Sequence, residues 1–91
     1  MPYDANLLRQ LRNEIPIDRV ITDILKLPAK RINQILRFTC PKCRNRHTAT
    51  SREHNLARCF DCNQSFNPID LVMCTTKCDF VDAVESLKKY L

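Results

Sequence analysis

A chain of 91 residues with a formal net charge of +5 suits one small domain, which buries a modest share of its surface and often needs a staple such as a metal ion. It has no glycine, which excludes P-loop and Rossmann nucleotide sites, where the backbone must approach a phosphate closely. It also has no apolar run long enough to span a bilayer and no signal-peptide pattern, so we expect a reducing, cytoplasmic setting.

Two short helices are predicted at the start of the chain, over about residues 4–27. Leucines at helical spacing follow Asp4, which is placed to cap the first helix. Pro16 breaks this helix, and a second apolar stripe over residues 17–27 runs up to Pro28. Such stripes are more often buried in a core than offered to a partner, so we expect both helices to pack against the rest of the domain.

A small antiparallel sheet is predicted next, within about residues 31–66. Residues 31–39 alternate between apolar and polar side chains near their end and are predicted as one strand. Residues 48–50 and 55–60 are predicted as two more strands, joined by a polar turn. Asn63 is expected to form a left-handed turn, because asparagine tolerates positive φ better than most residues.

Two Cys-x-x-Cys pairs lie in this sheet region. Cys40 and Cys43 form the first pair, and Cys59 and Cys62 form the second after fifteen intervening residues. The spacing is typical of a structural zinc site, in which each turn directs two thiolates at one ion. Four protein sulfurs leave no position for water or substrate, so the expected cofactor is one structural Zn²⁺. Two disulfides or idle thiols are the alternative, which a reducing compartment disfavours.

Two more helices are predicted after the second cysteine pair, over about residues 68–90. Asn67 can cap the first of them, with a proline at its first position. Asp79 can cap the second, with Asp82 in the place of a capping-box acid. The predicted fold class is therefore α+β: a zinc ribbon flanked by short N- and C-terminal helices, in a single domain over residues 1–91.

The positive charge is concentrated on the ribbon. Residues 26–62 carry nine lysines and arginines against two acids, a net charge of +7, whereas residues 1–25 and 63–91 each carry three bases against four acids. A basic patch between near-neutral flanks indicates a polyanionic partner, of which nucleic acid is the first candidate. Part of the charge can instead offset a tetrathiolate zinc centre, which is formally −2.

Taken together, these features resemble the zinc-binding domain of bacterial and phage DnaG-type DNA primases, over about residues 15–91. The resemblance rests on a first pair that begins Cys-Pro, a second pair that reads Cys-Phe-Asp-Cys, the segment Pro-Ile-Asp-Leu-Val-Met from Pro68, and the segment Phe-Val-Asp-Ala-Val-Glu-Ser-Leu from Phe80. The family commonly has histidine where Cys43 stands, so this site is a pure tetrathiolate. A glycine-rich bend of the family is replaced here by residues 63–66.

The resemblance implies a module that engages single-stranded template DNA for primer synthesis and is not catalytic by itself. In that family a separate domain polymerises, so a primase polymerase domain or a helicase is the implied partner. The start at Met1 and a final helix up to Leu91 favour a complete small protein over a fragment. The alternatives are a protein-interaction adaptor of a replication complex, which docks through its terminal helices, and an RNA-binding or transcription-type zinc ribbon.

The residues predicted to contact nucleic acid lie on or beside the ribbon. Basic side chains would contact phosphates, and an aromatic ring would stack on a base. A solvated basic face is the alternative for every member of this group. The predicted set is Arg37, Lys42, Arg44, Arg46, Arg52, Arg58 and Phe60.

Five further residues are expected to have structural roles only. His47 and His54 should lie on the surface, because four sulfurs already complete the metal shell. Cys74 and Cys78 should be buried free thiols, since two thiols without nearby ligands make a poor second zinc site. Phe66 is expected in the core.

Overall fold

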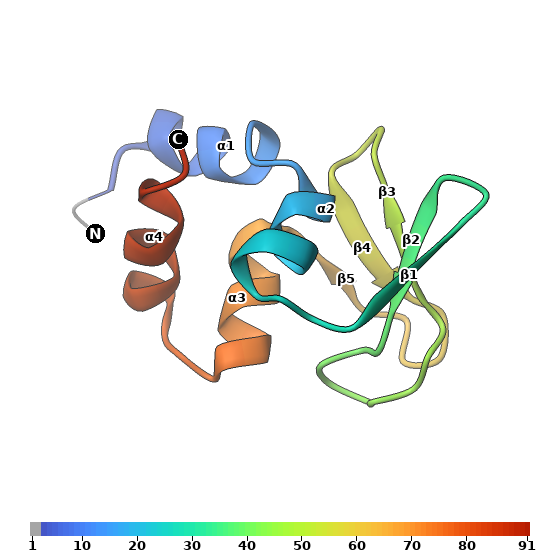
Figure 1. Ribbon diagram of the computed structural model, residues 1–91. Helices are drawn as coiled ribbons and strands as arrows, with labels where there is room; N and C mark the ends of the chain where they lie inside the picture. The colour runs from blue at the N-terminus through green and yellow to red at the C-terminus, as the bar shows by residue number, and fades with distance from the viewer. Residues whose placement is uncertain (1–2) are drawn as a thin grey trace.

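The computed structural model describes residues 3–91, with helices at one end and a sheet at the other (Figure 1). The helices are α1 (Ala5–Asn13), α2 (Ile17–Arg19) with its π-helical continuation η1 (Val20–Ile24), α3 (Pro68–Thr76) and α4 (Phe80–Lys88). The strands are β1 (Ala29–Ile32), β2 (Ile35–Phe38), β3 (Thr48–Ser51), β4 (Leu56–Cys59) and β5 (Ser65–Phe66). The predicted α+β zinc-ribbon class is confirmed.

The five strands form one antiparallel meander in which each strand pairs with the next along the chain. Alternation along the strands buries one face of the sheet, as in β2, where Leu36 and Phe38 are buried and the residues between and before them are exposed. The buried face packs into a core that also takes its apolar groups from all four helices. Its fully buried members include Leu11, Ile15, Val20, Ile21, Leu71, Val84 and Leu87.

The beginning of the sheet differs from the sequence prediction. The single strand predicted over residues 31–39 is a hairpin, in which β1 and β2 are joined by Asn33 and Gln34. Both turn residues have positive φ, 51° and 66°, as a two-residue turn with the twist of a hairpin requires. Asn-Gly is the usual signal for such a turn. This chain has no glycine, so the Asn-Gly signal is absent. Residues 31–39 were therefore predicted as one continuous strand.

The second N-terminal helix is shorter than predicted. Its last turn widens to π geometry in η1, and Lys26 then takes a left-handed conformation with φ 53°. The N–H of Leu27 donates to the carbonyl of Ile21 at 2.8 Å, which closes the helix end. The helix therefore ends before Pro28, at the left-handed conformation of Lys26. The spacing of apolar residues did not predict this conformation.

The predicted helix caps are present. Asp4 accepts from the N–H of Asn6 at 3.0 Å, and Asp79 accepts from the N–H of Asp82 at 2.8 Å. The reciprocal capping box, however, is formed at α3 by Asn67 and its partner three residues on, and not at the Asp79 cap. Within residues 3–91, no helix has the length and apolar character needed to cross a membrane.

Candidate metal centre and nucleic-acid interface

The two Cys-x-x-Cys pairs lie close together at one end of the sheet. One ligand atom from each of Cys40, Cys43, Cys59 and Cys62 lies within 4.8 Å of the others. The Sγ atoms of Cys40 and Cys62 are 3.8 Å apart, and those of Cys43 and Cys59 are 3.3 Å apart. A tetrahedron with zinc–sulfur bonds of about 2.3 Å has sulfurs about 3.8 Å apart, so the four positions fit one zinc ion. They form a closed, structural type of site.

The backbone holds each pair in the same way. The N–H of Cys40 donates to the carbonyl of Asn45 at 2.9 Å, and the N–H of Cys59 donates to the carbonyl of Gln64 at 2.9 Å. Each pair is thus closed into a tight loop by a bond to the residue five positions on. Asn63 lies in the second loop with φ 56°, as predicted from its tolerance of the left-handed region. The bend therefore forms without glycine.

The surroundings of the sulfurs shift the thiol pKa values in opposite directions, down for Cys59 and up for Cys43. Burial raises the pKa of Cys59, but the backbone N–H groups of Cys62 and Asp61 and the thiol of Cys43 outweigh burial and lower the pKa to about 6. The backbone at Asn45 lowers the pKa of Cys43, while burial and the neighbouring sulfurs raise it to about 12. Since zinc binds thiolates, loading the site must displace protons, chiefly from sulfurs such as Cys43.

A model of the CHC2 zinc finger family matches residues 3–91. The chain belongs to this family. The family is the zinc-binding domain of DnaG-type primases, so the resemblance of the motifs and the prediction of a zinc cofactor are both confirmed. No curated protein matches the chain significantly. This CHC2 zinc finger completes its metal shell with the sulfur of Cys43.

The outer face of the zinc finger's sheet carries a basic row that crosses all five strands. The register pairs Lys30 with Arg37, Arg37 with Ala49, Ala49 with Arg58, and Arg58 with Ser65. Directly paired residues project from the same face of a sheet. Lys30, Arg37 and Arg58 therefore lie in line, and the only other side chains in the row are the small ones of Ala49 and Ser65. Like charges directly opposite each other destabilise a sheet, and the strands contain no acid to offset them.

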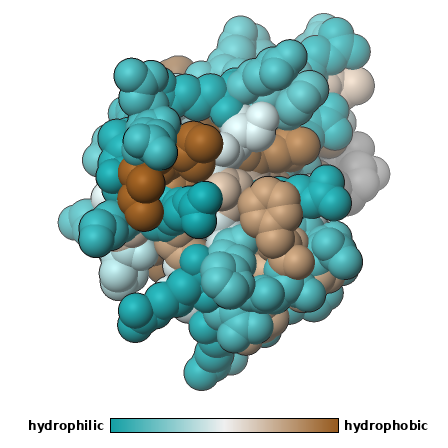
Figure 2. Space-filling view, turned by 90° about the vertical axis from the view of Figure 1, so that its right-hand side faces the viewer, coloured by the Kyte–Doolittle hydropathy of each residue, from teal (hydrophilic) through white to brown (hydrophobic). Residues whose placement is uncertain are grey.

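Phe60 follows β4 and adds an aromatic ring to this region. Its side chain is 62% exposed, and its N–H donates to the carbonyl of His47 at 3.1 Å. The guanidinium carbon of Arg58 lies 5.9 Å from the centre of the ring. Figure 2 shows the sheet end of the molecule as mainly hydrophilic, with separate apolar side chains set among the polar ones. Exposed apolar residues of the sheet region are Phe60, Ile32 and Ile35.

The remaining predicted contacts fall in two places. Lys42, Arg44 and Arg46 are exposed on the loop of the first cysteine pair, beside the zinc site. Arg44 has φ 64°, and its N–H donates to the carbonyl of Cys40 at 2.9 Å, so its backbone helps to close that loop. Arg52 lies in the turn between β3 and β4, at the opposite end of these strands from the cysteines. The structure therefore separates Arg52 from the rest of the predicted set.

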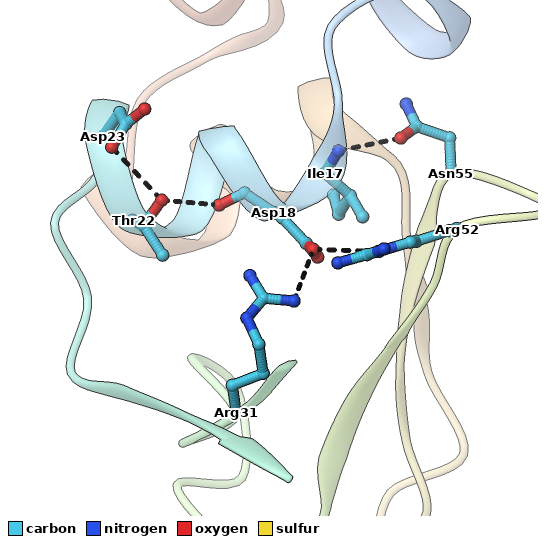
Figure 3. Close-up of polar contacts among 7 residues, drawn as sticks. All are labelled: Ile17, Asp18, Thr22, Asp23, Arg31, Arg52 and Asn55. Carbon is cyan, nitrogen blue, oxygen red and sulfur yellow. Dashed lines mark hydrogen bonds and ion pairs between the residues drawn. The ribbon is translucent and has the colours of Figure 1, made fainter. Parts of the chain in front are cut away.

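Arg52 also has a partner within the protein (Figure 3). Its Nε lies 3.3 Å from the Oδ2 of Asp18, and the Nη1 of Arg31 lies 3.3 Å from the same oxygen. This carboxylate joins α2 to both β1 and the β3–β4 turn. Sequence reasoning missed the contact because it links residues far apart in the chain. It also omitted Lys30 from the interface, since only the β1–β2 register places Lys30 beside Arg37.

The two histidines and Phe66 lie where they were predicted. The side chains of His47 and His54 are 66% and 67% exposed, and neither belongs to the sulfur cluster. The Nδ1 of His47 is 2.7 Å from the Oδ2 of Asp61, which links the loops of the two cysteine pairs. Phe66 is 5% exposed and belongs to the core.

Cys74 and Cys78 are half-buried rather than buried. Helix α3 ends at Thr76, between them, and the hydroxyl of Thr76 lies 3.0 Å from the Sγ of Cys78. Burial raises the pKa of Cys74, and the nearby Cys40 raises it further. Neither thiol joins the four-sulfur cluster.

Replacing Cys74 and Cys78 together by alanine is expected to leave zinc content at one ion per chain. Stability should fall by about 1 kcal/mol, because half-buried thiols act as small apolar groups. Metal analysis and urea unfolding of the variant and the parent protein measure both quantities. A variant that is folded but has lost its zinc would show that the metal shell includes one of these two sulfurs.

Proposed function

We propose that this CHC2 zinc finger binds single-stranded DNA on the outer face of its sheet and serves as the template-engaging module of a primase. The observation that carries the proposal is the cross-strand row of Lys30, Arg37 and Arg58, with the exposed ring of Phe60 beside it. Cations that oppose one another without acids weaken the sheet, and the phosphates of a bound strand supply the missing negative charge.

The arrangement suits a single strand better than a duplex. Basic side chains along a sheet can follow a sugar–phosphate backbone, while an exposed aromatic ring stacks on an unpaired base. The bases of a duplex are already stacked and offer no free face to a ring such as Phe60. Stacking also tolerates any base, so the proposal includes no strong sequence preference from this ring alone.

The proposed role is non-catalytic and depends on a partner. Among the described residues, the only group of three or more clustered His, Cys, Asp or Glu ligand atoms is the tetrathiolate, whose four sulfurs leave no site for a reacting group. Primer synthesis would therefore require a polymerase domain, alone or with a helicase. Because one small sheet offers few phosphate contacts, we expect the isolated chain to bind a strand weakly.

Charge reversal at Arg37 and Arg58 is expected to weaken single-stranded DNA binding on the order of tenfold at 0.1 M salt and to flatten the salt dependence. Each lost phosphate contact should reduce the slope of log K against log salt by about 0.7. Fluorescence anisotropy at several salt concentrations measures both effects. The matched control reverses Arg9 and Lys89, which are exposed on α1 and just after α4 and change the net charge equally.

Phe60→Leu provides a second arm of this experiment. Loss of stacking should lower affinity with the salt slope unchanged, because stacking releases no counterions. DNA, RNA and duplex probes of equal length rank the possible nucleic-acid partners. If the reversal at Arg37 and Arg58 leaves primer synthesis by a reconstituted complex unaltered, the adaptor interpretation replaces the proposal.

A further inference from the structure

A hollow of about 450 Å³ lies at the β1 edge of the sheet, between the open end of the β1–β2 hairpin and the loop of the first cysteine pair. Lys30, Arg37 and Arg46 line it, and Pro28 and Ile32 supply apolar wall. Its volume falls within the range of small-ligand sites, which combine an apolar surface with a few converging polar groups. The row of cations on the outer face therefore ends in a concave site.

The three cations of this hollow lack acidic partners. Among the residues that the structure describes, none of the three forms an ion pair, and no acid lines the hollow. By contrast, Arg31 and Arg52 share the carboxylate of Asp18 (Figure 3). Lys30 and Arg37 are also held directly opposite each other by the strand register. What distinguishes this hollow is that three cations line it together with no acid beside them.

Three cations around one hollow match a compact anion with several charges. A nucleic-acid strand spreads its phosphates along its length, one charge at a time, whereas a triphosphate places several charges within one small volume. Proteins often hold a triphosphate with backbone N–H groups of a glycine-rich loop. This chain has no glycine-rich loop, and the phosphate-binding groups that line the hollow are lysine and arginine side chains.

We propose that the hollow binds the triphosphate group of a nucleotide, either free or at the 5′ end of an RNA. Lys30, Arg37 and Arg46 contact the phosphate oxygens, and the apolar wall at Pro28 and Ile32 accepts the sugar or base. The inference rests on the proposed function in one respect, since Lys30 and Arg37 also belong to the row that follows the strand. Arg46 belongs to the hollow and Arg58 to the row alone, so the two sites can be tested separately.

The test titrates inorganic tripolyphosphate and inorganic phosphate into the zinc-loaded chain by calorimetry. Tripolyphosphate should bind at least tenfold more tightly than phosphate. Arg46→Gln should reduce tripolyphosphate affinity about tenfold. Arg58→Gln, which changes a residue outside the hollow, should weaken binding of a 5′-hydroxyl DNA strand and leave tripolyphosphate affinity within twofold. Arg9→Gln, on the exposed side of α1, removes the same charge away from both sites and should change neither.

Equal losses in Arg46→Gln and Arg9→Gln, or equal affinity for tripolyphosphate and phosphate, would overturn the hollow as a triphosphate site. Intact tripolyphosphate binding without any strand binding would contradict the proposed function and leave the hollow standing. ATP and a short RNA with a 5′-triphosphate distinguish the two sources of the ligand, with the 5′-hydroxyl RNA as control. Preference for the triphosphorylated RNA over ATP assigns the site to an RNA end, and the opposite order assigns it to free nucleotides.

Discussion

Removing zinc from the protein is expected to unfold the sheet. Cys40 and Cys59 are fully buried and belong to the same core cluster as the apolar residues of the helices, so the metal site is continuous with the core. Structural zinc contributes on the order of 10 kcal/mol in small modules, which is comparable to the whole stability of a domain of this size. Without the ion, the contact between His47 and Asp61 still links the two cysteine loops, but an exposed pair of this kind contributes far less than the metal.

Circular dichroism during chelator titration, with metal analysis of the same samples, measures this effect. Cys59→Ser should prevent zinc retention and folding, while Cys74→Ser serves as the matched control, because it changes a thiol outside the four-sulfur cluster. Zinc added back should restore the sheet signal of the chelated parent protein. A demonstrably metal-free sample that keeps its full sheet signal would mean that the core, not the ion, maintains the fold.

The metal site was predictable because its signal is local. Two residues between paired cysteines place both thiols on one turn, and this geometry depends little on the rest of the fold. The caps at Asp4, Asn67 and Asp79 were predictable for the same reason, since each bonds to a backbone N–H two or three residues away. Short-range hydrogen bonds of this kind are set by the local sequence.

The hairpin and the basic row were not predictable in the same way. The turn at Asn33 and Gln34 requires two non-glycine residues at positive φ, which is unfavourable locally and is maintained by the strand pairing around it. Once that turn is missed, Lys30 cannot be placed beside Arg37. Register is a long-range property of the whole sheet, whereas the charges themselves were visible in the composition.

Asp18 illustrates the same limit for single residues. Nothing in its neighbourhood along the chain indicates that it accepts from Arg31 and Arg52, which lie 13 and 34 residues away. Arg52 was therefore grouped with the other arginines of the ribbon by composition alone. The fold assigns it an intramolecular contact between the sheet and α2 (Figure 3).

Asn55 also forms side-chain hydrogen bonds to the N-terminal helices, and Asn55→Ala is expected to destabilise the protein by about 3 kcal/mol. Its Oδ1 accepts from the N–H of Ile17 at 2.7 Å (Figure 3). Its Nδ2 donates to the carbonyls of Arg12 and Ile15 at 2.6 and 2.8 Å. These backbone groups lie where α1 ends and α2 begins, so helical bonds cannot satisfy all of them. Alanine removes all three hydrogen bonds.

Two variants separate the contributions to this loss. Asn55 also has φ 53°, a conformation that costs alanine about 1 kcal/mol. Asn33→Ala, at φ 51° in the exposed β1–β2 turn, carries the same backbone cost and should lose only about that amount, since the Asn33 side chain forms no hydrogen bond with residues 3–91. Asn55→Gly keeps the backbone freedom and loses the three bonds. Urea unfolding of zinc-loaded samples ranks the stabilities of the three variants. Equal destabilisation by Asn55→Ala and Asn33→Ala would show that the side-chain hydrogen bonds of Asn55 contribute nothing. The carboxylate of Asp18 would then be the polar link between α2 and the sheet.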